Sequence, residues 1–369
     1  MRLASFNVEN MFDRAVALNE NNWADGRPAL EAHKTLNELF NKPAYSASDK
    51  SKILTTLQAQ GLLKRDEGPY LILRKIRGKL LNRPTSGPVT VAATGRSSWI
   101  GWVEMKTEPV KETATDNTAR VMQAVNPDVL GVVEAEDRTT LKLFSRTALP
   151  AVGAAPYEHV MLIDGNDERG IDVGILTHAT YPILAVRSHV FDVDAEGVIF
   201  SRDCAEYEIG LPAGGSLWVL VNHFKSKGYG PQADNDAKRK RQATRVRAIY
   251  DGHLAAADTL VAIVGDFNDS PEKPTLQPLL ANNGPKDISS YPNFNNGGRP
   301  GTFGNCTAAN KFDYILLSPA LFAAVATAGI ERQGMWGGTN GTLWPHFPEV
   351  TGPDDAASDH AALWVDLNI

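Results

Sequence analysis

Short runs of apolar residues, many of them β-branched, recur along the chain and end abruptly in acidic, amide or histidine side chains. The clearest run is Leu260–Asp269, where Leu-Val-Ala-Ile-Val leads into a glycine and then into Asp266, Asn268 and Asp269. Such a run is typical of a strand buried on both faces. Asp266 and Asn268 lie two residues apart, so an extended backbone points them the same way. A carboxylate beside a carboxamide can hold a divalent cation or orient a water, although polar turns after strands are also common.

Five further strands are predicted with the same kind of polar end. Alternation in Arg2–Glu9 predicts a strand that ends in Asn7 and Glu9. An apolar run at Val129–Val133 predicts a buried strand, and Glu134 follows it directly. The remaining three are Leu217–Asn222, which runs into His223; Phe312–Leu317, which carries Asp313; and Ala361–Leu367, which follows Asp359 and His360.

Six strands that end in such residues indicate a site, because strand ends in a layered sheet converge on one rim. The stretch 14–115 has a different character. Asn19–Pro28 is rich in Asn, Asp and Gly, which predicts a loop, whereas Leu30–Phe40 and Ser51–Leu63 have apolar residues at helical spacing. We find no internal repeat and no linker that divides the chain. The sequence therefore predicts one domain, 1–369, with a long insertion at about 14–115.

The composition is that of an ordinary globular protein, with 43% hydrophobic and 22% charged residues among 369. A net charge of −6 argues against a protein that coats polyanions, so any nucleic-acid contact must come from local basic patches. Two stretches qualify, 64–83 and 238–247. The window 61–100 holds eight basic residues against two acidic ones. Each stretch is also compatible with an ordinary solvated face.

Two cysteines, Cys204 and Cys306, are too few for a disulfide framework or a cysteine-rich zinc site. We expect two unpaired buried thiols, with one bridge as the alternative. No window approaches the length of a membrane span, and the first residues lack a charged-then-apolar secretory pattern. The expectation is a cytoplasmic protein, or a secreted one if a leader has been trimmed.

The polar strand ends resemble the signatures of the endonuclease/exonuclease/phosphatase superfamily, which has the deoxyribonuclease I-like fold. They occur in family order, cover residues 1–12 and about 117–369, and are specific as a set although modest singly. Residues 14–115 match nothing in the family. The matching signatures are Phe6-Asn7-Val8-Glu9, Asp128-Val129-Leu130-Gly131 through Glu134, Asn222-His223, Gly265-Asp266-Phe267-Asn268, Asp313-Tyr314 and Ser358-Asp359-His360.

The resemblance implies an α/β fold, a four-layered α/β sandwich in which two mixed, mostly antiparallel sheets pack face to face with helices outside. It also implies hydrolysis of a phosphoester that depends on Mg²⁺ or Mn²⁺, with Ca²⁺ as a further candidate ion. By position it makes Glu134 the principal metal ligand. Asn7 and Glu9 are expected near that ligand, and Asp359 is expected close enough to contribute.

The resemblance also assigns catalytic and phosphate-binding roles. It makes His360 the catalytic histidine, Asp313 the carboxylate that orients it, and Asp266 the group that aligns or deprotonates the attacking water. Whether imidazole or Asp266 acts as the base stays open. The family's tyrosine near the scissile phosphate has no clear match. The implied phosphate contacts are Asn222, Asn268 and His223, with Arg169 and Asp172 as weaker candidates.

The leading functional prediction is a metal-dependent endonuclease that cleaves DNA. The segment Asn222–Gly228 resembles bacterial nucleases of this superfamily, and the stretches 64–83 and 238–247 would supply backbone contacts. One alternative is a phosphodiesterase on a small or lipid-headgroup substrate, sphingomyelinase-like or phosphoinositide phosphatase-like. Exposed aromatic residues in the late loops would favour that alternative, namely Trp336, Trp344 and Phe347. A silent binding module is a further alternative, but every candidate catalytic residue is present.

Overall fold

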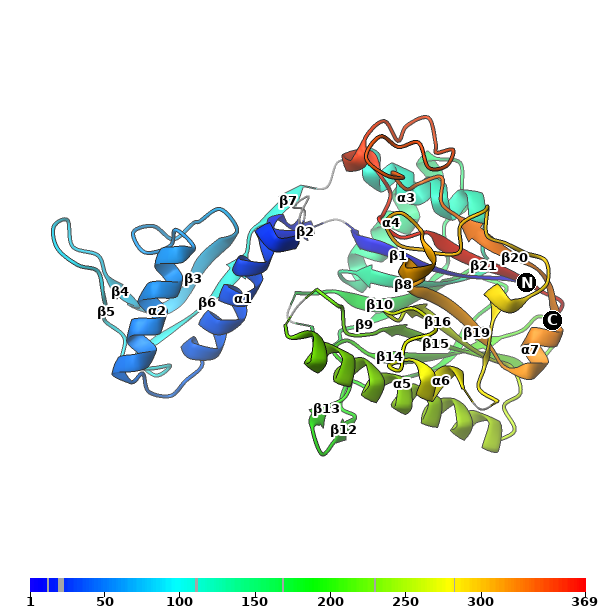
Figure 1. Cartoon of the computed structure of the whole chain (residues 1–369), viewed down its shortest axis with the longest axis horizontal. Helices are drawn as coiled ribbons and strands as arrows, with labels where there is room; N and C mark the ends of the chain where they lie inside the picture. The colour runs from blue at the N-terminus through cyan, green and yellow to red at the C-terminus, as the bar shows by residue number, and fades with distance from the viewer. Residues whose placement is uncertain (12, 19–22, 110–111, 168, 229, 282) are drawn as a thin grey trace. The chain divides into compact units, whose positions relative to one another are not determined.

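The structure is a computed structural model that describes the chain except for residues 12, 19–22, 110–111, 168, 229 and 282. Two compact units are present (Figure 1). The large unit comprises Met1–Phe12 and Val110–Ile369, and the small unit comprises Asp13–Pro109.

Two sheets form the centre of the large unit. In spatial order the seven-stranded sheet comprises β18 (Phe294–Asn295), β20 (Val325–Glu331), β21 (Ala362–Leu367), β1 (Arg2–Met11), β8 (Val129–Ala135), β10 (Asp172–Thr177) and β9 (His159–Ile163). The six-stranded sheet comprises β11 (Ile183–Arg187), β14 (Cys204–Gly210), β15 (Ser216–His223), β16 (Val261–Asp266), β19 (Asp313–Leu317) and β17 (Lys286–Asp287). The pairs β1/β8, β18/β20 and β15/β16 are parallel and the others antiparallel.

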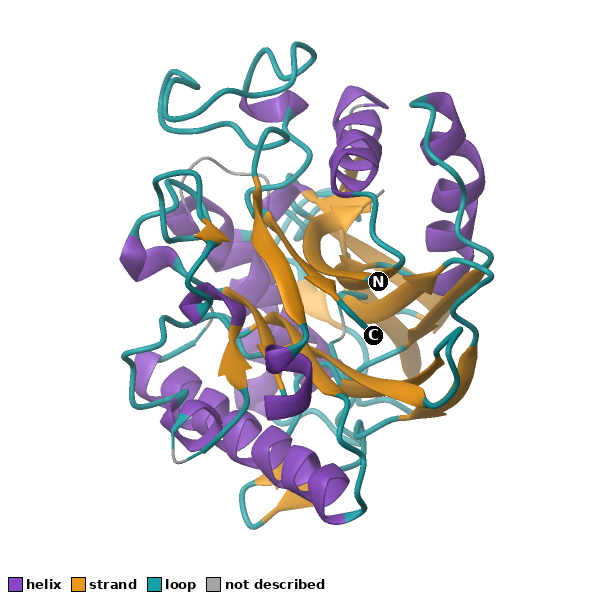
Figure 2. Cartoon of the chain, turned by 90° about the vertical axis from the view of Figure 1, so that its right-hand side faces the viewer, coloured by secondary structure: helices purple, strands orange, loops and turns teal. Residues whose placement is uncertain are grey.

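Helices cover the outer face of each sheet. The helices of the large unit are α3 (Glu112–Val125), α4 (Arg138–Ala151), α5 (Gln232–Ala255), α6 (Gln277–Leu280) and α7 (Pro319–Ala323). One apolar core lies between the sheets, a second packs the seven-stranded sheet against α3 and α4, and a third packs the six-stranded sheet against α5 and α6. Figure 2 shows the strands of the large unit between these helices. The predicted four-layered α/β sandwich, with mixed and mostly antiparallel sheets, is confirmed.

The apolar runs formed strands because each could be buried on both faces. All six residues of β16 are buried, with alternate side chains in the core between the sheets and the core beneath α5. Gly265 has φ +129°, and a Cβ there would lie 1.9 Å from the carbonyl oxygen of Asn222. Glycine is therefore required for β15 and β16 to approach each other at their carboxyl ends.

Two local predictions were wrong. The predicted loop Asn19–Pro28 is helical from Trp23, where α1 (Trp23–Phe40) begins, while 19–22 lie outside the described residues. Gly26 packs against the backbone of Ala17, and Asp25 lies in the first turn, where a carboxylate favours the helix. Alternation in His189–Phe200 predicts an antiparallel strand, but the stretch forms only a short hairpin, β12 (Val193–Asp194) with β13 (Gly197–Val198).

The small unit has a core of its own. Its elements besides α1 are β2 (Asp13–Ala15), a short 3₁₀ turn (Val16–Leu18), α2 (Ala47–Ala59), β3 (Leu71–Gly78), β4 (Leu81–Asn82), β5 (Thr90–Val91), β6 (Trp99–Met105) and β7 (Thr107–Pro109). Helix α2 begins with a capping box between Ser46 and Asp49, which is worth about 1 kcal/mol. The core side chains include Leu36, Phe40, Ile53, Trp99 and Val103.

Two expectations about the whole chain can be checked directly. Cys204 and Cys306 are both buried and unbridged, as predicted. Among the described residues, no helix is both long enough and apolar enough to cross a membrane.

A buried chain of alternating carboxylates and histidines joins α5 to the six-stranded sheet. Glu206 on β14 accepts from the Nε2 atoms of His189, at 2.6 Å, and His253. The Nδ1 atoms of these histidines lie 2.8 Å from carboxylate oxygens of Asp192 and Asp258. Burial alone lowers the pKa of both histidines, but the carboxylates outweigh it and raise both pKa values. Burial raises the pKa of Glu206, but the histidines outweigh this and lower it to about 2.

These shifts predict a pH window for stability. The histidine pairs stabilise the fold fully below the unfolded pKa of 6.5, and this contribution is lost as pH rises through the higher folded pKa. The Glu206 contribution is present above the unfolded pKa of 4.5 and is lost as pH falls toward 2. Other groups facing the histidines are Asp203, which accepts from the His189 amide, Arg245, which pairs with Asp192, and the Trp218 ring.

We expect the free energy of unfolding to be greatest between about pH 4.5 and 6.5 and to fall by about 1 kcal/mol or more by pH 9. Urea unfolding at a series of pH values measures this. In His253→Gln, or in His189→Gln, the decline above pH 6.5 becomes shallower. A decline of unchanged slope in both variants would show that other groups cause it.

Candidate active site

Strand register brings three predicted residues side by side at one edge of the six-stranded sheet. His223 at the end of β15 is the partner of Asp266 at the end of β16, and Asp266 is in turn the partner of Asp313 at the start of β19. All three side chains are buried. Strands β1 and β8 of the other sheet pack against these strands, so Asn7 and Glu134 reach the same edge.

Asp313 and His360 form a buried pair. The Nδ1 atom of His360 lies 2.8 Å from Oδ2 of Asp313, and its Nε2 atom lies 3.9 Å from Oδ2 of Asp266. Burial alone lowers the pKa of His360, but Asp313 and Asp266 outweigh it and raise this pKa well above its usual value. The backbone N–H of His360 donates to Ser358 Oγ, which itself donates to the Asn7 carbonyl. The ring is therefore fixed from both sides, with Nε2 directed at Asp266.

Asp266 lies at the centre of the cluster. Its Oδ1 accepts from the backbone N–H of Asn268 at 2.7 Å, and its Oδ2 accepts from the side-chain amides of Asn268 and Asn7 at 3.0 and 3.3 Å. Burial raises the pKa of Asp266 to about 8; protonated His360 opposes this shift and Asp313 adds to it. Asp266 is therefore a desolvated carboxyl group held by three donors.

Glu134 and His223 complete the side of the cluster nearest β8. Asn7 Nδ2 donates to Glu134 Oε1 at 3.2 Å, and His223 Nε2 lies 3.6 Å from the same oxygen and 3.7 Å from Asp266 Oδ2. Burial, reinforced by Arg202, lowers the pKa of His223 well below its usual value. Both ring nitrogens lack a hydrogen-bond partner among the described residues. A neutral, buried, unpartnered imidazole beside two carboxylates is suited to a ligand.

Glu9 and Asp359 lie next to this cluster. The Glu9 carboxylate accepts from the backbone N–H of Asp359 at 2.8 Å, and the backbone N–H of Glu9 donates to Asn7 Oδ1 at 3.0 Å. Asp359 Oδ1 lies 3.7 Å from His360 Nε2. The structure thus links both residues to the cluster through Asn7 and His360.

Backbone strain is concentrated at these residues. Seven non-glycine residues in the described part of the chain have positive φ, and three of them belong to the cluster: Glu9 at 54°, Glu134 at 66° and Asn268 at 52°. Such conformations cost about 1–3 kcal/mol each and persist where a functional site requires them. Glu134 is the bulged residue of β8, because Val173 and Asp172 of β10 pair with Val133 and Ala135 on either side of it.

A cationic network borders the cluster, and most of it was missed from the sequence. Asp167 pairs with Arg169 at 2.7 Å and with the fully buried Arg202 at 2.9 Å, and Arg202 also donates to the Phe224 carbonyl at 3.3 Å. Burial lowers the pKa of Lys225 to about 7, and the neighbouring Arg202 and Arg169 add to the shift. Arg202 stands in an irregular segment, so periodicity gave no signal for it, whereas Lys225 lies in the segment Asn222–Gly228, which already stood out in the sequence.

One predicted residue points away from the cluster, and a second lies in the network that borders it. Asn222 points to the opposite face of β15 from His223, and its amide donates to the Leu220 carbonyl at 3.1 Å. Asp172 accepts from the backbone N–H of Gly165 at 2.7 Å. Burial raises the pKa of Asp172 to about 7.

The basic stretch 238–247 is used within the large unit. Among its six cations only Lys240 has neither an ion-pair partner nor a side-chain hydrogen bond in the described part of the chain. The other five are bound as follows: Lys238 to the Val198 carbonyl, Arg239 to Asp236 and Asp269, Arg241 to Asp194, Arg245 to Asp192, and Arg247 to Asp251. The prediction that this stretch contacts a nucleic-acid backbone therefore has no support in the structure.

The donor groups fit a divalent cation. Single donor atoms of Glu134, His223 and Asp266 all lie within 4.8 Å of one another, as do those of Asp266, Asp313 and His360. Carboxylate and amide oxygens suit Mg²⁺ and Mn²⁺, and imidazole is compatible with Mn²⁺. The unpartnered nitrogens of His223 and the strained Glu134 agree with an ion in the first group.

The comparisons with known proteins agree with this architecture. A mannosyl-6-phosphatase from Bacteroides thetaiotaomicron has a similar structure, with a TM-score of 0.51 and 18% identity over 69% of this chain and 91% of that one, and shows the fold alone. The truncated Caenorhabditis elegans TDP2 has a TM-score of 0.46 and 17% identity over 69% and 89%, and the human nocturnin catalytic domain has 0.48 and 15% over 70% and 87%. No curated protein sequence matches the chain.

The sequence profile of the endonuclease/exonuclease/phosphatase family matches residues 99–327, which is more than half of the chain. The chain belongs to the endonuclease/exonuclease/phosphatase family, whose members hydrolyse phosphoester bonds.

Proposed function

We propose that this protein is a divalent-metal-dependent phosphodiesterase that cleaves DNA internally. The observation that carries the proposal is the arrangement of His360 between Asp313, at 2.8 Å, and Asp266, at 3.9 Å, within reach of a group that can hold a cation. Hydrolysis of a phosphodiester needs a base for water, positive charge at the phosphate oxygens and fixed donors around them. The cluster has all three.

In the proposed mechanism Asp313 holds the His360 ring so that Nε2 faces the reacting phosphate. The raised pKa of His360 keeps this nitrogen protonated, so it donates to a phosphate oxygen and stabilises the charge that develops there. Asp266, oriented by Asn268 and Asn7, accepts the proton of the attacking water as its oxygen bonds to phosphorus. The P–O bond opposite breaks at the same time, and the leaving oxygen takes a proton from solvent. His223 offers its Nε2 atom to a second phosphate oxygen.

Glu134 is the proposed principal ligand of the cation, with Asn7, Glu9 and Asp359 beside it. A bound Mg²⁺ or Mn²⁺ supplies Lewis-acid stabilisation of the phosphate oxygens. Arg169 and Arg202 add fixed positive charge on the far side of His223, where they keep that imidazole neutral.

The distribution of charge favours a polyanionic substrate. The small unit carries 15 Lys and Arg against 10 Asp and Glu, a net charge of +5. Because the whole chain has −6, the rest of it has −11. Because most of the cations of 238–247 are bound within the large unit, the stretch 64–83 is the remaining candidate for contacts to the phosphate backbone of DNA.

The lipid-headgroup alternative depended on exposed aromatic residues in the late loops, and these residues are not exposed as a cluster. Trp336, Trp344 and Phe347 are half-buried. Trp336 lies against His346, and the Trp344 indole donates to the Met335 carbonyl at 3.3 Å. These aromatic side chains pack on their own loop and form no exposed cluster.

Metal-dependent nicking of supercoiled plasmid tests the proposal. We expect cleavage with Mg²⁺ or Mn²⁺, none in EDTA, and recovery when the ion is restored. In Glu134→Gln the metal concentration for half-maximal rate should rise by at least about tenfold. Mn²⁺ should also raise the unfolding temperature of the wild type more than that of Glu134→Gln, which checks the ion site without using activity.

Glu158→Gln is the control, since it removes a carboxylate at the opposite end of a neighbouring strand. A folded wild type that is stabilised by Mn²⁺ but leaves plasmid intact would overturn the DNA assignment. Parallel assays with bis(p-nitrophenyl) phosphate, p-nitrophenyl phosphate and sphingomyelin then identify the ester class.

A further inference from the structure

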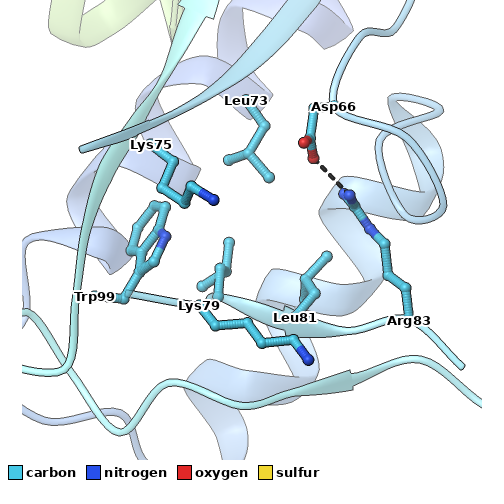
Figure 3. A pocket seen from close by; sticks show the side chains of 8 residues that line it. Asp66, Leu73, Lys75, Lys79, Leu81, Arg83 and Trp99 are labelled. Carbon is cyan, nitrogen blue, oxygen red and sulfur yellow. Dashed lines mark hydrogen bonds and ion pairs between the residues drawn. The ribbon is translucent and has the colours of Figure 1, made fainter. Parts of the chain in front are cut away.

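The small unit contains a cavity of about 100 Å³ beside β3, far larger than one water needs (Figure 3). Three leucines and Trp99 form its apolar lining, and Lys75, Lys79, Arg83 and Asp66 also border it. We call this cavity the lysine pocket. In Figure 3 the Lys75 side chain lies beside Trp99, across the pocket from the Asp66–Arg83 ion pair.

The charges around the lysine pocket are not balanced. Arg83 pairs with Asp66 at 2.6 Å and donates to three backbone carbonyls of the adjoining loop, so these two groups satisfy each other. Lys75 and Lys79 have no ion-pair or hydrogen-bond partner among the described residues. Both lysine side chains are exposed and border the same cavity, so an anion from solvent can reach them there. A phosphate group, with its negative oxygens, suits this position.

The strand that carries Lys75 is basic on its other face as well. Lys75 pairs in register with Gly101 and Arg77 pairs with Ile100, so Ile76 forms a bulge that turns Arg77 to the face opposite the pocket. Arg74, on that opposite face, is neutralised by Glu104 at 2.7 Å, whereas Arg77 only donates weakly to the Ser97 carbonyl at 3.5 Å. The strand thus presents unneutralised cations on both sides.

Apolar side chains are exposed beside these cations. Ile76 is 69% exposed and Trp102, opposite Arg74 on β6, is 41% exposed. Trp102 shares the face of Arg77, opposite the lysine pocket. Exposed aromatic surface beside such a cation suits unstacked bases, which a single strand offers and a duplex does not.

We infer that β3, β6 and the lysine pocket bind the phosphate backbone of a single-stranded polynucleotide, with one phosphate at Lys75 and Lys79 on one face of the β3–β6 pair and a base against Trp102, beside Arg77, on the other face. This inference rests on the proposed function and extends it, because it assigns substrate capture to the small unit. The acidic remainder of the chain, at −11, gives a polyanion little general attraction, whereas the small unit gives +5.

Binding of fluorescein-labelled oligothymidylate to the full chain in EDTA tests the inference without catalysis. Each phosphate neutralised on a single strand contributes about 0.7 to the slope of log K against log salt, so Lys75→Gln/Lys79→Gln, which removes one phosphate site, should lower the slope by about 0.7. Lys50→Gln/Lys52→Gln on α2 is the matched control, with the same charge change in the same unit. Trp102→Ala should weaken oligothymidylate binding by about tenfold.

An unchanged slope in Lys75→Gln/Lys79→Gln, or an equal change in the control, would overturn the lysine pocket as a phosphate site. Duplex DNA that binds as tightly as the single strand would overturn the single-strand assignment. Inorganic phosphate that competes with oligothymidylate at similar concentrations would show a small-anion site instead. The same variants should hydrolyse bis(p-nitrophenyl) phosphate at the wild-type rate. This assay therefore distinguishes failure of the proposed catalytic function from failure of the proposed binding site.

Discussion

His360→Ala should lower kcat for phosphodiester hydrolysis by about 10²–10⁴-fold, the range over which a positioned proton donor acts. The His360 ring lies between two carboxylates, with Nε2 3.9 Å from Asp266 Oδ2 and Nδ1 2.8 Å from Asp313 Oδ2. Because the proposed role is in the transition state, kcat should fall and KM should change little. Steady-state kinetics on a small phosphodiester with saturating Mn²⁺ measure both.

Asp313→Asn should cause a comparable loss, because the amide no longer fixes the tautomer or supports the charge of His360. In the double variant His360→Ala/Asp313→Asn the fall in kcat should be much smaller than the product of the two single falls, because the two residues act as one unit. His178→Gln, a histidine outside the cluster, is the control for folding and general effects. If the falls in kcat of the two single variants multiply fully in the double variant, the two residues act independently and the proposed pairing is contradicted.

The sequence predicted the sandwich because burial on both faces demands continuous apolar strands, and the polar residues that end them are visible as interruptions. It also named His223, Asp266 and Asp313, which the structure places on three adjacent strands. Spacing alone could not supply the register that makes them neighbours. The sequence identified Glu134 as a carboxylate at a strand end, but it could not predict that this residue adopts a positive φ.

Charge pairing is where sequence reasoning failed, because it is a tertiary property. The cations of 238–247 looked free, yet Asp194 and Asp192, which neutralise Arg241 and Arg245, lie 47 and 53 residues away along the chain. Arg202 was missed for the converse reason: a single arginine in an irregular segment has no pattern, although its burial places it against Asp167. Only the folded structure shows which cations are neutralised by an ion pair and which are available to a ligand.

Asp266→Asn should abolish most activity and at the same time stabilise the protein. Burial raises the pKa of Asp266 from 3.8 to about 8, so ionisation at neutral pH opposes folding. For an acid with a raised folded pKa, stability is lost as pH rises from the unfolded pKa through the folded one. Asparagine keeps the shape without the charge, and its amide oxygen can replace Oδ2 and accept from the side chains of Asn268 and Asn7, whereas the Asn268 backbone N–H loses its acceptor.

We expect the free energy of unfolding of Asp266→Asn in EDTA to exceed that of the wild type by about 1–3 kcal/mol at pH 7. The difference should shrink as pH falls and vanish below about pH 3, where the wild-type carboxyl is protonated in both the folded and the unfolded state. Added Mn²⁺ should narrow the gap, because a cation beside Glu134 and Asp266 stabilises the ionised wild type more. A variant less stable than the wild type at every pH would mean that the hydrogen bonds to Asp266 outweigh its desolvation. Asp266 would then stabilise the fold as well as serve in catalysis, and its catalytic role would carry no cost in stability.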